Sequence, residues 1–179
     1  MELLSQTRKT DRNRFTRMCI GESLIDLLQE HSFEEIKITD ITKKAGVSRM
    51  TYYKYYESKQ ETLADYLEEI VGEYVTHTSR KEDIGQFHDY EHILYSLEFF
   101  HQYRHFMLSL VHANLYSIII HAINTYMEEY VLPDFDGSIY ELYYYSGALL
   151  NVFLTWEEKD SEKPAEEIAQ IIHSFLHLG

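Results

Sequence analysis

The sequence predicts an all-α protein in which a three-helix head is joined to a larger helical-bundle body. Apolar residues recur at helical spacing over almost the whole chain. Proline and glycine, which interrupt helices, are scarce, with 2 and 7 among 179 residues. Residues 38–63 carry the caps and the glycine of two short helices joined by a tight turn. The domain boundaries that follow are 1–58 for the head and 59–179 for the body.

The first expected helix precedes His31 and lines the core of the head. Its apolar residues Ile20, Leu24 and Leu28 share one face at helical spacing. A second helix can be capped by Thr39, and Gly46 ends it by adopting a left-handed conformation. These local signals predict two helices that meet at the turn following Gly46.

A third short helix, residues 49–55, follows the turn, with Ser48 as its N-cap. Two short helices joined by a glycine-containing turn can place the second helix in the major groove of DNA. An ordinary helical hairpin uses the same turn, but the outward side of residues 49–55 offers hydrogen-bond donors for phosphates and base edges. The candidate DNA-contacting residues are Thr39, Lys43, Ser48, Arg49, Met50, Thr51, Tyr53, Lys54, Tyr55 and Lys59.

Within this face, Arg49 and Thr51 are the best candidates for base contacts, whereas Tyr55 also suits a packing role. Upstream, Arg8, Lys9, Arg12, Arg14 and Arg17 form a basic run. It is either a solvated terminus or an arm that contacts phosphate or the minor groove. Both interpretations place positive charge beside the helix-turn-helix.

The segments ITKKAGVS (41–48), TYY (51–53) and YESKQETL (56–63) resemble the signature of the tetracycline-repressor (TetR) family. The resemblance covers residues 12–65. It departs at Thr42 and Tyr56, where alanine and phenylalanine are common, and at Leu63, which comes one residue late.

The resemblance implies a phosphate contact by Lys59 and a DNA-backbone contact by Tyr53. It also implies an operator-binding regulator whose body binds a small effector, and repression is the commoner mode. An activator, or a member controlled by a co-regulator protein, is the alternative within this class. The single cysteine, Cys19, and an N-terminal segment without a secretory-type apolar core lead us to expect a cytoplasmic protein.

The charge distribution agrees with a nucleic-acid-binding head. Residues 1–60 contain 11 Lys/Arg and 9 Asp/Glu, a net charge of +2, whereas residues 61–179 contain 5 and 21, a net of −16. The total of −14 would argue against nucleic acid if it were spread evenly. This asymmetry lets the head approach phosphate while the body is repelled from it.

The body is rich in aromatic and histidine residues, which suit either a plain core or a pocket with a few polar groups. From Glu82 to Trp156 the only Lys or Arg is Arg104, against ten Asp/Glu. An anionic ligand would lack partners there, so we expect a neutral or cationic, largely apolar effector. The candidate pocket residues are Phe100, His101, Arg104, His105, Met107, Tyr116, Ile120, Tyr126 and Tyr143.

The last two expected helices carry adjacent apolar stripes, and Pro164 opens the second of them. One subunit cannot cover both stripes, so we expect a homodimer that buries them in a four-helix bundle. The candidate interface residues are Tyr143, Leu149, Leu150, Phe153, Ile168, Ile172 and Phe175.

A function of another class, a His-rich metal-binding helical bundle, rests on three i, i+4 histidine pairs. These are His88/His92, His101/His105 and His173/His177, and none has the further ligands that a tetrahedral site needs. We expect no metal, no cofactor and no enzymatic activity, because no catalytic motif occurs. Residues 106–127 lack charged side chains but contain His112 and Asn114, so we expect a buried helix there and no membrane association.

Overall fold

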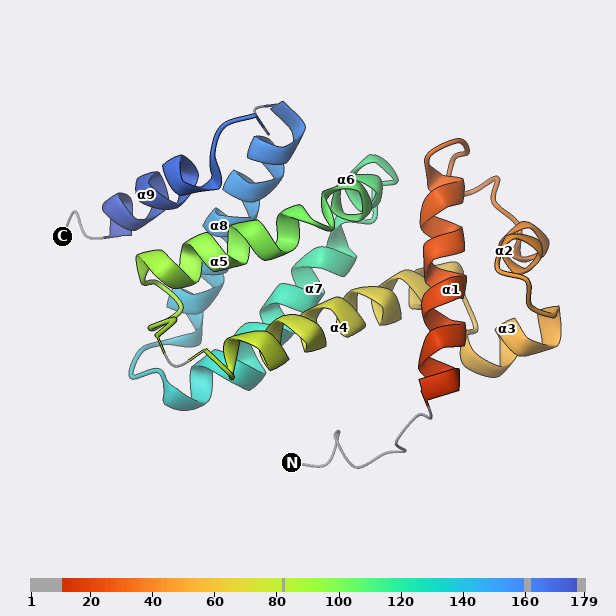
Figure 1. Ribbon diagram of the computed structural model, residues 1–179, viewed down its shortest axis with the longest axis horizontal. Helices are drawn as coiled ribbons and strands as arrows, with labels where there is room; N and C mark the ends of the chain where they lie inside the picture. The colour runs from red at the N-terminus through yellow and green to blue at the C-terminus, as the bar shows by residue number, and fades with distance from the viewer. Residues whose placement is uncertain (1–10, 82, 160–161, 177–179) are drawn as a thin grey trace. The chain divides into compact units, whose positions relative to one another are not determined.

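The computed structural model describes residues 11–81, 83–159 and 162–176, with side chains from Asn13 onwards. These residues form nine α-helices and no strand (Figure 1), which confirms the all-α prediction. The chain divides into two compact units, one ending at Leu67 and the other beginning at Glu68. We call the first unit the head and the second the body.

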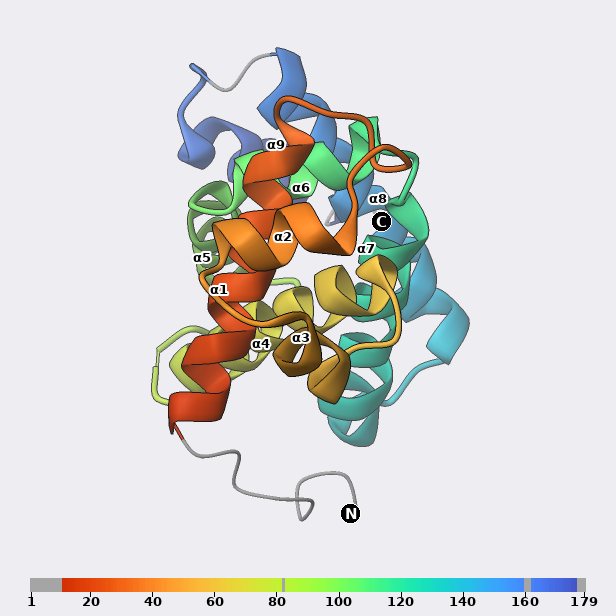
Figure 2. The same ribbon diagram turned by 90° about the vertical axis from the view of Figure 1, so that its right-hand side faces the viewer.

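The head contains α1 (Asp11–Leu28), α2 (Ile38–Lys44), α3 (Arg49–Tyr55) and the beginning of α4 (Lys59–Thr78). Helix α2 packs on α1, and α3 packs on α2 (Figure 2). The side chains that fill the centre of the head are fully buried: Ile20, Leu24, Ile41, Tyr52 and Leu63. The predicted first-helix stripe therefore does face this core.

The turn between α2 and α3 has the predicted chemistry. Gly46 has a φ of +66°, the left-handed conformation expected after a helix C-terminus. Ser48 caps α3 by accepting a hydrogen bond from the backbone N–H of Thr51 at 3.0 Å. The expected cap of α2 was wrong, because Lys37 occupies that position and its N–H donates to the Asp40 carboxylate at 3.1 Å.

The body contains the rest of α4 and five further α-helices. Three of these helices follow one another between residues 90 and 126, with short breaks after His101 and after His112. A π-helical turn, η1, extends the third of them, and α9 packs along α5 (Figure 1). The bounds are α5 (Tyr90–His101), α6 (Arg104–His112), α7 (Tyr116–Tyr126), η1 (Met127–Val131), the 3-10 turn η2 (Leu132–Asp134), α8 (Ile139–Lys159) and α9 (Ala165–Leu176).

Helix α6 ends at His112, and Asn114 follows with a φ of 57°. Asparagine tolerates this left-handed conformation better than most residues do, so it can turn the chain into α7. Among the described helices, none is both long enough and apolar enough to span a lipid bilayer.

Candidate nucleic-acid interface

Helix α3 has one buried side and one exposed side. Tyr52 is fully buried in the head, whereas Met50 and Tyr53 are 78% and 53% exposed. Arg49 and Lys54 are also exposed, and the guanidinium carbon of Arg49 lies 6.0 Å from the centroid of the Tyr53 ring. The exposed side therefore offers two cations and an aromatic ring to a partner.

The ten predicted DNA-contacting residues all lie on α2, on α3, directly before α3 or at the first position of α4. Thr51 is only partly exposed, and its hydroxyl lies 2.9 Å from the hydroxyl of the cap residue Ser48. Lys59 and Tyr55 are also partly exposed, and the other seven are exposed: Thr39, Lys43, Ser48, Arg49, Met50, Tyr53 and Lys54.

The ammonium group of Lys59 is bound within the head. It donates hydrogen bonds to the carbonyl oxygens of Phe33 and of Ile36, the latter at 2.7 Å. It also lies 4.3 Å from the centroid of the Phe33 ring, within cation–π range. Burial lowers the pKa of this ammonium below its ordinary value. Lys59 therefore fastens the loop after α1 to the start of α4, a role that sequence reasoning missed.

The hydroxyl of Tyr55 is likewise bound within the head. It donates a 2.9 Å hydrogen bond to the side-chain oxygen of Asn13 on α1. The packing role that the sequence left open for Tyr55 is therefore present in the structure.

In the body, an aromatic cluster surrounds the buried side chain of Tyr74 on α4. Its ring centroid lies 5.2 Å from that of Phe100 and 5.7 Å from that of Tyr126, two predicted pocket residues. Its hydroxyl lies 2.6 Å from that of Ser96. Burial raises the pKa of Tyr74 well above its ordinary value, so the phenol stays neutral. Tyr74 was not among the predicted pocket residues.

The other seven predicted pocket residues differ in burial and in the contacts that they make. His105 and Tyr116 lie on the surface, and Met107 is buried in the core. The hydroxyl of Tyr143 donates a hydrogen bond to the Glu128 carboxylate. His101, Arg104 and Ile120 are partly exposed.

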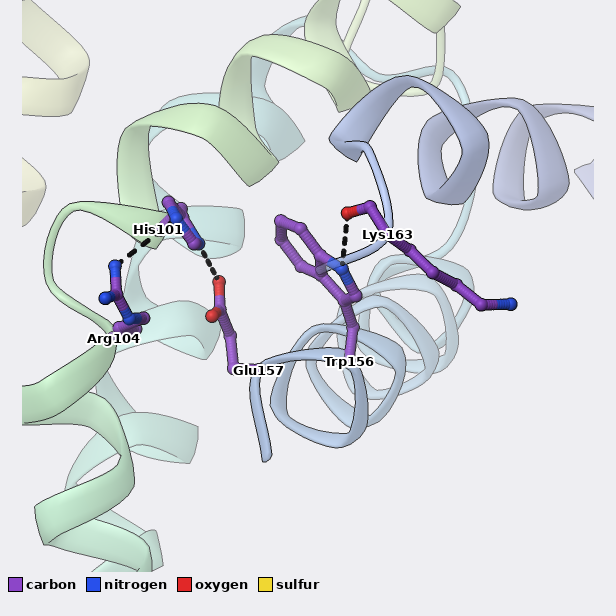
Figure 3. A network of polar contacts seen from close by, with 5 residues as sticks. All are labelled: His101, Arg104, Trp156, Glu157 and Lys163. Atoms are coloured by element: carbon purple, nitrogen blue, oxygen red, sulfur yellow. Dashed lines mark hydrogen bonds and ion pairs between the residues drawn. The ribbon is translucent and has the colours of Figure 1, made fainter. Parts of the chain in front are cut away.

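A network of polar side chains in the body joins α5, α6 and α8 (Figure 3). His101 Nδ1 lies 2.7 Å from Oε1 of Glu157, and its Nε2 lies 3.3 Å from Nη1 of Arg104. Its ring also stacks on Trp156, whose indole N–H donates to the carbonyl oxygen of Lys163 at 3.1 Å. The Glu157 side chain is fully buried, and no described residue hydrogen-bonds its second oxygen.

The structure corrects part of the predicted dimer interface. Leu150, Phe153 and Ile168 are buried within the body of the single chain, so they belong to its own core. Phe175 is exposed, and Tyr143, Leu149 and Ile172 are partly exposed. Helices α8 and α9 carry further exposed large apolar side chains that the sequence analysis did not select: Tyr140, Tyr144, Ile171 and Leu176.

The histidine pairs do not gain further ligands within the described ranges, where no three His, Cys, Asp or Glu side chains are grouped to hold a metal. His92 is buried and faces the carbonyl oxygen of Gly85 at 3.4 Å. His177 and the basic residues Arg8 and Lys9 lie outside the described residues.

Residues 22–65 match the family described as "Bacterial regulatory proteins, tetR family". Over 49 residues the chain is 31% identical to the dhaKLM operon transcriptional activator DhaS of Lactococcus lactis. This match covers 27% of the present chain and 26% of DhaS. The similarity in sequence thus spans about a quarter of that protein.

Solved structures extend the comparison to the fold of the chain. A TetR transcriptional regulator from Rhodococcus sp. RHA1 matches with a TM-score of 0.62 at 14% identity, over 94% of this chain and 98% of that one. FadR from Bacillus subtilis, solved with stearoyl-CoA, matches with a TM-score of 0.61 at 14% identity, over 90% and 98%. The family model thus matches the helix-turn-helix region of the head, and the fold over most of this chain is similar to that of solved TetR regulators.

Proposed function

We propose that this protein regulates transcription by binding double-stranded operator DNA through α2 and α3. The proposal rests on the contrast between the two sides of α3. Tyr52 is buried in the head, whereas Arg49, Tyr53 and Lys54 are exposed on the opposite side. A helix entering the major groove needs this arrangement, because one side must be held while the other meets base edges and phosphates. The net positive charge of residues 1–60 supports the same assignment.

The exposed residues divide into two classes of DNA contact. Arg49 lies at the first position of α3, where it can reach a base edge, and guanine is the base that arginine binds bidentately. Lys43 and Lys54 suit phosphates, because an ammonium group is a mobile point charge. The hydroxyl of Tyr53 can donate a hydrogen bond to a neighbouring DNA phosphate.

Selection of bound fragments from random DNA tests this proposal. The selected sequences should share a pseudo-palindrome, as a dimer with two heads requires. Arg49→Ala should relax the preference at one position and weaken binding by roughly 1–3 kcal/mol. Lys54→Ala should weaken binding to all sequences alike and reduce the salt slope by about 1 per half-site. Failure to enrich any sequence would refute operator binding.

We also propose a homodimer in which the exposed apolar residues of α8 and α9 contact a second copy. Phe175 and Ile171 on α9 are 65% and 56% exposed, and Tyr140 and Tyr144 on α8 are 77% and 71% exposed. Exposed large apolar side chains of this kind are candidates for an interaction surface. A symmetric pair of copies would cover them and present two heads to one operator.

The body is proposed to bind a small, largely apolar effector that is neutral or cationic and that releases the protein from DNA. Its one cation between residues 82 and 156, Arg104, contacts His101, which in turn contacts the buried Glu157. The Glu157 carboxylate offsets the Arg104 charge, so an anionic ligand would find no net positive charge there. FadR of Bacillus subtilis was solved with stearoyl-CoA, which carries phosphates. We expect the present chain to bind an effector of a different class, without such negative charges.

A thermal-shift screen over matched cationic, neutral and anionic aromatic compounds tests the effector class. Stabilisation by cationic or neutral compounds supports it, and stabilisation by anions alone, abolished in Arg104→Ala, contradicts it. The mode of regulation is a separate test. Repression is proposed, whereas DhaS is described as an activator. A reporter gene behind the selected operator should be more active without this protein than with it.

A further inference from the structure

The recognition helix α3 is held by the hydroxyl groups of three tyrosines. It has seven residues, fewer than an isolated helix needs to be stable, so its position depends on contacts with the rest of the head. Tyr52, Tyr55 and Tyr56 lie at i, i+3 and i+4, which places them on one side of the helix. This side is opposite to the proposed DNA-binding side.

Two of these hydroxyls bind different helices. The hydroxyl of Tyr52 is fully buried and lies 2.9 Å from the hydroxyl of Thr62 on α4, which is fully buried as well. The hydroxyl of Tyr55 donates to Asn13 on α1 at 2.9 Å. The two bonds therefore attach α3 to both neighbouring helices.

The third hydroxyl joins an ion pair between the same two helices. Tyr56, the C-cap of α3, is buried and donates to the carboxylate of Asp65 on α4 at 2.6 Å. Asp65 also forms an ion pair with Arg17, a buried residue of α1. Burial and the bond to the carboxylate raise the pKa of Tyr56, which keeps its proton available for donation. The C-terminal end of α3 is therefore fixed to α1 and α4 together.

Packing of rings alone leaves a short helix free to slide and rotate by small amounts, because apolar contacts are not directional. Hydrogen bonds require defined distances and angles, so three of them to two helices fix the position of α3 along and around its axis. We infer that Tyr52, Tyr55 and Tyr56 are positioning residues that set the register of α3 for base recognition. This inference rests on the proposed DNA binding.

The inference predicts a loss of discrimination between DNA sequences. Phenylalanine keeps the ring packing and removes only the hydroxyl, so the head should still fold around α3. Contacts to base edges depend on the position of α3 more strongly than contacts to phosphates do. The double variant Tyr52→Phe/Tyr55→Phe should therefore lose roughly tenfold in affinity for the selected operator, about a few-fold for each hydrogen bond removed. Its affinity for unrelated DNA should change by less than about twofold.

Two measurements on the full chain test it. The first compares operator and non-specific affinities of the parent, Tyr52→Phe, Tyr55→Phe and the double variant, with Tyr130→Phe as a matched control in the body. Tyr130 is 45% exposed and is far in sequence from the head. The second is amide hydrogen exchange of α3 in the protein without DNA, which reports how firmly the helix is held whether or not it binds DNA.

We expect faster exchange across α3 in the Tyr→Phe variants, unchanged exchange in Tyr130→Phe, and a reduced ratio of specific to non-specific affinity. Asn13→Ala should reproduce Tyr55→Phe, and combining these two should add little further loss. Unchanged exchange and an unchanged affinity ratio would overturn the inference. Equal losses for operator and unrelated DNA would also overturn it, since they indicate a general loss of folded head. A parent protein without sequence preference would refute the proposed function instead, while the exchange data would still decide whether the hydroxyls hold α3.

Discussion

Nδ1 of His101 lies 2.7 Å from Oε1 of Glu157, and this contact joins α5 to α8. Arg104 Nη1 lies 3.3 Å from Nε2 of the same ring. Because a guanidinium can only donate, Nε2 accepts that bond and the ring proton resides on Nδ1. The three residues connect α6, α5 and α8.

The first prediction concerns the buried acceptor in this contact. Glu157→Gln keeps an oxygen for the His101 N–H and removes a buried charge whose second oxygen has no described partner. Its stability should stay within about 1 kcal/mol of the parent. Glu157→Ala removes the acceptor and leaves a cavity, so it should cost about 2–4 kcal/mol in urea denaturation. Equal losses in both variants would show that the negative charge itself stabilises the body.

The second prediction concerns Lys59. Lys59→Met keeps much of the aliphatic stem but loses the bonds to the carbonyl oxygens of Phe33 and Ile36, so it should destabilise the head by about 1–3 kcal/mol. Lys43→Met is the matched control, because Lys43 is exposed and its loss should change stability by less than about 0.5 kcal/mol. Thermal unfolding of both variants measures the difference. If the thermal stability of Lys59→Met equals that of the parent, the bonds of Lys59 within the head do not stabilise it, and DNA contact is its remaining proposed role.

The third prediction is a pH dependence of stability due to His92. Burial lowers its pKa, although the Gly85 carbonyl and Asp89 partly oppose this. The unfolded chain therefore binds a proton at a higher pH than the folded chain does. The stability that neutral His92 provides is complete above the unfolded pKa of about 6.5 and falls as the pH drops from there towards the lower folded pKa.

Urea midpoints at about pH 7.5 and about pH 5.5 measure this effect, and His92→Gln should show a smaller difference between the two than the parent does. Other histidines contribute equally to both proteins, so the comparison isolates His92. An identical pH dependence in the two proteins would contradict the assignment.

The fourth prediction separates the surface of α8 and α9 from their core. Tyr144→Glu combined with Phe175→Glu should give monomers in analytical ultracentrifugation with unchanged helical circular dichroism, since both side chains are exposed. Leu150→Ala should instead destabilise the fold by about 2–5 kcal/mol, because Leu150 is buried within the chain. If the double glutamate variant remains a dimer, Tyr144 and Phe175 do not lie in the dimer interface and the proposed interface is wrong.

Much of the head could be predicted from the sequence because its signals are local. Gly46 and Ser48 act on their own backbone and immediate neighbours, and α3 has the predicted bounds of residues 49–55. The cap of α2 was missed because Thr39 and Lys37 are both compatible with a helix start, and the bond from Lys37 to Asp40 decides between them.

The body was less predictable because an apolar stripe does not show what covers it. Leu150 and Ile168 have the same spacing whether they face their own chain or a second copy, and the structure buries them in their own chain. Glu157 lies one turn after Phe153 and shares its side of α8, but it was not among the predicted site residues. Its partner His101 is 56 residues away.

The all-α class, the helix-turn-helix with its turn residues, and the contrast in charge between residues 1–60 and the remainder could all be inferred from the amino-acid sequence. These depend on helical periodicity, backbone conformation and composition, which neighbouring residues specify. Three contacts became visible only in the folded chain: Lys59 bonds to the carbonyl oxygens of Phe33 and Ile36, Tyr55 bonds to Asn13, and Glu157 is buried against His101. Each of these contacts joins residues that are far apart in the chain, and the direction of a side chain towards a distant partner is fixed by packing, which spacing along the sequence does not contain.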